Sequence, residues 1–144
     1  MNTTATIGAP ALNLALAWVW LLLGFISGLG LGLCFHRENW LGGYGSFPRR
    51  LYRLAHVSFF GLGFTNLGFY FTALRWPASE PWLSIASVSF LLGALFMPIC
   101  CVLTAHWPRF RSLFAVPVLS LLLGAALTVL LLLRQAPSSI LSKL

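Results

Sequence analysis

The chain has 144 residues, a mean hydropathy of +0.90 and 59% hydrophobic residues, whereas charged residues make up only 8%. A water-soluble domain of this length needs a charged exterior, and nine basic residues with two glutamates cannot supply one, so the composition excludes a soluble globular protein. The net charge of +7 does not indicate a nucleic-acid partner, because the basic residues lie in short segments between apolar runs. Anionic lipid headgroups are the partner that we expect for them.

Four apolar stretches predict membrane-spanning helices, and they cover approximately residues 11–35, 54–74, 83–105 and 113–133. Each has about 20 residues or more, which at ~1.5 Å per residue crosses the ~30 Å hydrocarbon core of a bilayer. Only helices satisfy the backbone amides within segments of this kind. The sequence therefore predicts an all-α, integral membrane four-helix bundle, with residues 1–144 as a single transmembrane domain.

The first predicted helix carries Gly24, Gly28 and Gly32 at a spacing of four residues. Small residues in this register let a second helix approach closely, so the pattern predicts a packing seam. The alternative is that glycine is simply common in membrane helices.

The three connections between these helices differ in length. The first, residues 36–53, is the longest and the richest in charged and aromatic residues, whereas residues 76–82 and 106–112 form short connections that make the flanking helices antiparallel neighbours. The side shared by the first and third connections carries six arginines: Arg37, Arg49, Arg50, Arg53, Arg109 and Arg111.

The other side carries only Arg75, Arg134 and Lys143. The positive-inside rule then predicts that both termini lie outside the cytoplasm. We expect a multi-pass protein of a bacterial inner membrane or an equivalent membrane.

All three histidines fall at the arginine-rich side, and two of them have mirror-related neighbours. Arg53-x-x-His56 enters the second helix, and His106-x-x-Arg109 leaves the third. Because these helices are antiparallel, the two imidazoles are expected at similar depth. Two facing imidazoles are the axial ligands that a b-type haem iron uses.

The spacing of Arg49, Arg53, His56, Phe60 and Gly63 is 4, 3, 4 and 3, which places them on one helical face. Such a face suits a flat macrocycle whose propionates pair with guanidinium groups. The candidate iron ligands are His56 and His106, and the other candidate cofactor-binding residues are Arg49, Arg53, Arg109 and His36, the last as a replacement ligand. The alternative is that the histidines make ordinary hydrogen bonds at the membrane interface.

The other polar residues give weaker indications of function than the histidines and arginines. Asn66 lies near the middle of a predicted span, and with Thr65 and Tyr70 it is expected to offer hydrogen bonds that hold helices together. The three cysteines and Met97 match no strong metal signature. The two glutamates are expected on opposite sides of the membrane, so no carboxylate pair is available and we expect no catalytic activity from this chain alone.

Two functions fit this sequence best, and a third, a small membrane enzyme or carrier that serves quinone or lipid chemistry, is kept only because polar groups lie at the membrane interface. The first is a subunit of a larger membrane complex that binds haem b between two histidines, as an electron-transfer or anchor subunit. The alternative is a cofactor-free structural or assembly subunit that docks a partner protein through its basic cytoplasmic loops. Both involve the lipid bilayer and other subunits, and neither involves nucleic acid.

Overall fold

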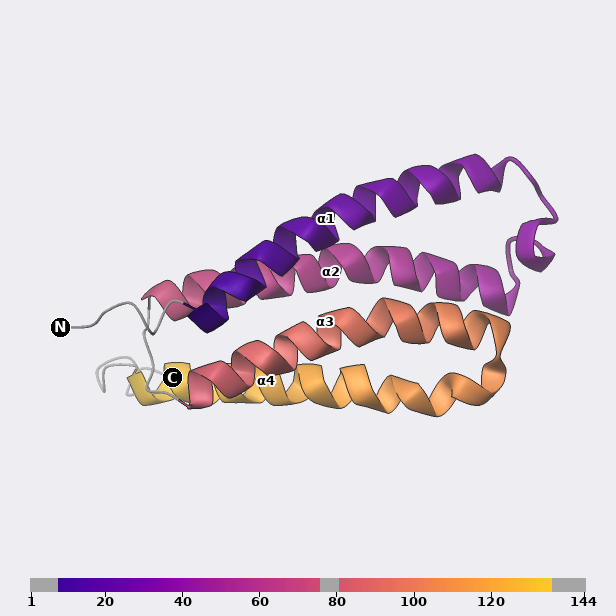
Figure 1. Ribbon diagram of the computed structural model, residues 1–144. Helices are drawn as coiled ribbons and strands as arrows, with labels where there is room; N and C mark the ends of the chain where they lie inside the picture. The colour runs from indigo at the N-terminus through magenta and orange to yellow at the C-terminus, as the bar shows by residue number, and fades with distance from the viewer. Residues whose placement is uncertain (1–7, 76–80, 136–144) are drawn as a thin grey trace, which may run out of the picture.

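The computed structural model describes residues 8–75 and 81–135, which form four long antiparallel helices and two short 3₁₀ segments, with no strand (Figure 1). Every long helix is long and apolar enough to cross a membrane, which confirms the predicted all-α membrane bundle. The elements are α1 (Gly8–Phe35), η1 (Trp40–Gly42), α2 (Phe47–Arg75), α3 (Trp82–His106), η2 (Pro108–Phe114) and α4 (Ala115–Gln135).

The helices pack in chain order, each against the next, and α1 also contacts α3 (Figure 1). One buried cluster joins Trp20, Leu62 and Ala94 from the first three helices, and a second contains Phe69 and Phe90. Large apolar side chains also cover the outside of the bundle, for example on α1 and α4. Hydrocarbon is the solvent that such a surface requires.

Helix α2 begins at Phe47, seven residues before the predicted membrane span that starts at residue 54. The backbone N–H of Arg49 donates to Ser46 Oγ at 3.3 Å, which is an N-terminal cap, and Pro48 occupies the first turn, where a missing N–H costs nothing. Arg49, Arg50 and Arg53 interrupt the apolar pattern but continue the helix. These three arginines therefore belong to α2 and not to the connection.

The predicted glycine seam is confirmed at two of its three positions. A Cβ at Gly24 would lie 2.8 Å from the Phe60 ring, and one at Gly28 would lie 2.8 Å from Cε1 of His56. Gly32 has nothing within 4 Å of such a Cβ, because α1 and α2 diverge toward the end of α1 (Figure 1). The seam therefore joins two helices of this chain.

A buried polar cluster links α1, α2 and α3. Asn13 Nδ2 donates to Asn66 Oδ1 at 2.8 Å, Ser87 Oγ donates to Asn13 Oδ1, and none of the three side chains is exposed. The structure confirms that Asn66 holds helices together. Thr65, by contrast, is exposed and donates only to the Gly61 carbonyl of its own helix.

Pro98 lies inside α3 and cannot donate to the carbonyl of Ala94. Nε1 of Trp20 donates to that carbonyl at 3.2 Å across the bundle. The Ala94 carbonyl, which the proline leaves without its usual donor, thus accepts a hydrogen bond that joins α1 to α3.

Two parts of the sequence-based interpretation lie outside the described residues. They are the middle of the second connection, residues 76–80, and Lys143.

Candidate functional site

The arginine-rich end of the bundle is formed by the last turn of α1, η1, the first three turns of α2, the last turn of α3, and η2. It contains all six arginines and all three histidines of the predicted site. Figure 1 shows that the α1–α2 and α3–α4 connections lie at this same end.

Arg49 is the most enclosed of these arginines, with 4% of its surface exposed. Its guanidinium carbon lies 4.5 Å from the Phe35 ring centroid, 5.4 Å from that of Tyr44 and 5.9 Å from that of Trp40. Nη1 donates to the backbone carbonyl of Glu38 at 3.3 Å, while Nε has no partner among the described residues. Desolvated cation–π contacts stabilise such a group by about 2 kcal/mol, so Arg49 fixes the α1–α2 connection onto α2.

Arg53 makes a second contact to the same connection. Its guanidinium carbon lies 4.4 Å from the Tyr44 ring centroid, and Nη2 donates to the Tyr44 carbonyl at 3.4 Å. Both predicted propionate-binding arginines of α2 are therefore engaged with residues of the α1–α2 connection.

His56 lies between α1 and α2. Ser27 Oγ lies 3.0 Å from the Gly24 carbonyl and 3.0 Å from Nδ1 of His56, so it either donates to the carbonyl and accepts from Nδ1 or donates to Nδ1, depending on the tautomer. The imidazole meets the Phe60 ring edge to face at a centroid distance of 5.4 Å and covers Gly28. This geometry turns His56 toward α1.

His106 is the last residue of α3 and is exposed. Its Nε2 lies 2.8 Å from the hydroxyl of Tyr52 in α2. Arg109, also exposed, lies in η2 with its guanidinium 5.1 Å from the Phe110 ring centroid. His36 is exposed in the turn after α1.

The predicted face of α2 exists, but it packs against α1 and the α1–α2 connection. Tyr52 and Phe59, seven residues apart, form the neighbouring face toward α3. Since His106 is level with Tyr52, His56 lies one turn deeper, about 6 Å along the axis. In this arrangement the two imidazoles do not face a common gap, and the bis-histidine haem site stays a prediction that requires His106 to leave Tyr52.

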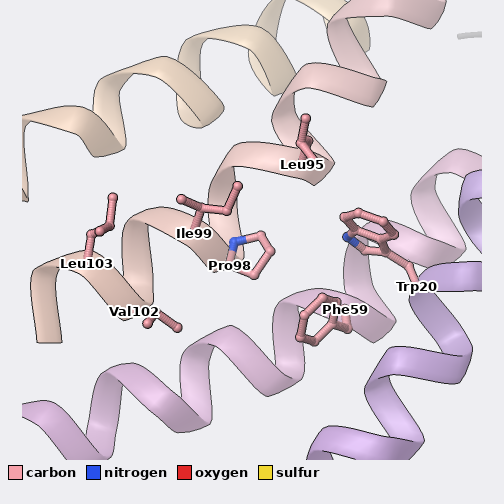
Figure 2. A pocket seen from close by; sticks show the side chains of 7 residues that line it. All are labelled: Trp20, Phe59, Leu95, Pro98, Ile99, Val102 and Leu103. Atoms are coloured by element: carbon pink, nitrogen blue, oxygen red, sulfur yellow. The ribbon is translucent and has the colours of Figure 1, made fainter.

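An apolar groove of about 390 Å³ lies between α2 and α3, at the depth of Trp20 (Figure 2). It extends along α3 toward the Tyr52–His106 pair. The lining side chains are Trp20, Phe59, Leu95, Pro98, Ile99, Val102 and Leu103.

The cysteines do not assemble a metal site. Cys100 and Cys101 are buried side by side in α3, with Cys100 Sγ 3.5 Å from the Leu113 carbonyl, while Cys34 lies at the end of α1. Within residues 8–75 and 81–135 no group of three or more His, Cys, Asp or Glu side chains is placed to hold a metal ion.

The sequence-based interpretation missed Tyr52 and Ser27, the partners of the two histidines. The spacing of Tyr52 and Phe59 by two helical turns is a signal that was available once α2 is extended back to Phe47. Ser27 gives no such signal, because a serine in a membrane helix ordinarily bonds its own backbone.

Comparison with protein-family models, with curated proteins and with solved structures found no match to this chain.

Proposed function

We propose that this protein is a structural or assembly subunit of a membrane complex, and that its arginine-rich end docks an acidic surface of a partner protein. The observation that carries the proposal is the unbalanced positive charge of this end. Arg37, Arg50 and Arg111 are exposed there, and Glu38 is the only carboxylate of the described residues at the same end.

The end is held in shape by the chain itself. Arg49 makes cation–π contacts with Phe35 at the end of α1 and with Trp40 and Tyr44 of the α1–α2 connection. Arg53 adds a fourth such contact, with Tyr44. Of the exposed arginines, Arg50 lies in α2, Arg111 lies in η2 and Arg37 lies in the turn after α1. A connection that is held in place favours association with an acidic partner, because less loop entropy is lost on binding.

The small extramembrane part of the chain supports the same function. Outside the four helices the described residues form only two short connections. We therefore assign no catalytic activity to this chain and attribute any reaction of the complex to a partner subunit. By the positive-inside rule, the docking end lies in the cytoplasm.

The test is extraction from native membranes in mild detergent, followed by measurement of particle mass. After the mass of bound detergent is subtracted, we expect a protein mass well above the 15.8 kDa of the chain, and dissociation of the particle when Arg37, Arg50 and Arg111 are all changed to Gln. Arg134→Gln, a charge change at the opposite end of the bundle, is the matched control and should leave the particle intact. A wild-type particle of monomer mass, or one that survives the triple change, contradicts the proposal.

The bis-histidine haem subunit is the second candidate, and one observation favours it. Ser27 orients His56 through Nδ1, as hydrogen-bond partners of metal-bound histidines do, and leaves Nε2 for a metal. When bound, haem would supply one-electron transfer. A visible spectrum of the protein purified from its native host tests this candidate, since a Soret band supports it and a featureless spectrum removes it.

A further inference from the structure

We infer that the groove between α2 and α3 is a specific site for one anionic phospholipid, whose acyl chain lies in the groove and whose phosphate meets His106 and Arg109. This inference does not depend on a protein partner or on haem. It rests on the lining of the groove, on the polar pair above it and on the charge of the arginine-rich end.

The lining selects hydrocarbon. Every residue that lines the groove is apolar except Trp20, and the one polar atom of Trp20 already donates to the Ala94 carbonyl. Water has no hydrogen-bond partner in such a space, so an apolar chain is the occupant that the chemistry admits. Leu95, Ile99 and Val102 are each about two-fifths exposed, which means that the groove opens toward the bilayer.

The length suits the tail of a lipid. From Leu95 to Leu103 the groove follows about 12 Å of α3, which approaches the ~15 Å hydrocarbon depth of one leaflet. Its volume of about 390 Å³ lies within the ~300–1,000 Å³ range of small-molecule sites.

The residues above the groove suit a phosphate. His106 follows Ile99 and Val102 on the same face of α3, at spacings of seven and four residues, and bonds Tyr52. If Tyr52 donates to Nε2, His106 keeps a donor at Nδ1; if Nε2 donates, the Tyr52 hydroxyl is the spare donor. In either arrangement the pair offers one hydrogen bond to a phosphate oxygen.

Charge decides between an anionic lipid and a neutral prenyl quinone as the occupant. Arg109 is exposed three residues after His106, and Arg111 and Arg50 are exposed at the same end. Guanidinium groups pair strongly with phosphate oxygens, whereas a quinone carbonyl needs no excess positive charge.

The experiment uses the purified, delipidated chain in mild detergent. Phosphatidylglycerol and phosphatidylcholine with identical acyl chains, and decylubiquinone, are each titrated while bound ligand is counted by native mass spectrometry and the thermal midpoint is measured. We expect one phosphatidylglycerol per chain, with affinity about tenfold higher than that for phosphatidylcholine, and a raised midpoint. Equal affinity for the two lipids, or stabilisation by the quinone alone, overturns the inference.

Two kinds of variant locate the site. Val102→Trp fills the groove and is expected to abolish stoichiometric binding, and Arg109→Gln, at an exposed position, is expected to weaken phosphatidylglycerol about fivefold without changing phosphatidylcholine. Val116→Trp, at a similarly exposed valine of α4, and Arg134→Gln are the controls and should bind as the unaltered chain does. If Val102→Trp does not fold, the Arg109→Gln result decides alone, and unchanged affinity in that variant contradicts the inference.

Discussion

At the level of His56 to Gly63, the two faces of helix α2 differ in how completely they are packed. Toward α1, glycines bring the backbones together: a Cβ at Gly63 would lie 3.3 Å from the Ala17 carbonyl, and Gly28 receives the imidazole of His56. Toward α3, Phe59 faces a groove that Pro98 and Trp20 also line. His56 and Arg49 lie on the closed face, while the groove on the open face is lined by apolar side chains, with the Tyr52–His106 pair above it.

The residues with prominent functional groups are therefore not the residues that a ligand can reach. His56 and Arg49 carry the functional groups that draw attention in the sequence, yet both are used to join α1 and its connection to α2. The face toward α3 attracts little notice in the sequence, but it is where a ligand has room.

The largest expected effect is on the closed face. Gly63→Leu forces α1 away from α2, because the first atom of the new side chain already meets a backbone carbonyl, and we expect a loss of about 1–3 kcal/mol in the free energy of unfolding. Gly61→Leu is the matched control, since that position has nothing within 4 Å, and it should change stability by less than about 0.5 kcal/mol. Reversible unfolding in mixed detergent measures both, and equal losses would show that the face is not closely packed.

A smaller effect is expected at the polar cluster. Asn66→Ala removes the acceptor at 2.8 Å from Asn13 Nδ2 and leaves a buried donor short of one bond, which should cost about 1–2 kcal/mol. Thr65→Ala removes only an exposed bond within α2 and should cost a few tenths of that. The same unfolding assay compares them; a larger loss for Thr65→Ala would mean that Asn13 and Asn66 are not paired in the bilayer.

The contact beside the groove is testable by a double-mutant cycle. Trp20→Phe leaves the Ala94 carbonyl without a donor and should cost about 0.6–1 kcal/mol. In a Pro98→Ala background the restored backbone N–H satisfies that carbonyl, so the loss attributable to the bond should shrink. Additive losses in the free energy of unfolding would show that the hydrogen bond from Trp20 to Ala94 does not depend on Pro98.

The smallest effect is expected at the exposed pair on the open face. Tyr52→Phe removes the 2.8 Å bond to His106, which water replaces at the end of the bundle, so we expect a loss of about 0.5 kcal/mol or less. Ser27→Ala, which removes the partner of the more enclosed His56, should cost more than this. The reverse order in thermal unfolding would contradict the assignment of closed and open faces.

Hydropathy alone predicted the four spans, because each stretch is long and carries few charges within its central window. It does not give the start of α2, because Arg49, Arg50 and Arg53 lower the apolar content of the first two helical turns. The cap at Ser46 and the proline at position 48 mark that start in the sequence, and they depend on backbone geometry that hydropathy does not measure.

The candidate site was predictable only in part. Helical spacing grouped Arg49, Arg53, His56, Phe60 and Gly63 on one face, and the structure shows them on one face. Spacing within a helix does not state which neighbouring helix that face meets, and here α1 provides glycines that admit it whereas α3 does not. The pairing of Asn13 with Asn66 is likewise a contact between distant segments, which no local pattern specifies.

The central geometric claim is that His56 faces α1, and disulfide trapping tests it directly. In native membranes, with Cys34, Cys100 and Cys101 replaced by Ala, the pair Ser27→Cys and His56→Cys should cross-link on mild oxidation, since the native side chains of these two positions contact each other across α1 and α2. The pair His56→Cys and His106→Cys should remain reduced under the same conditions. Rapid cross-linking of the two histidine positions, with none between positions 27 and 56, would contradict the account.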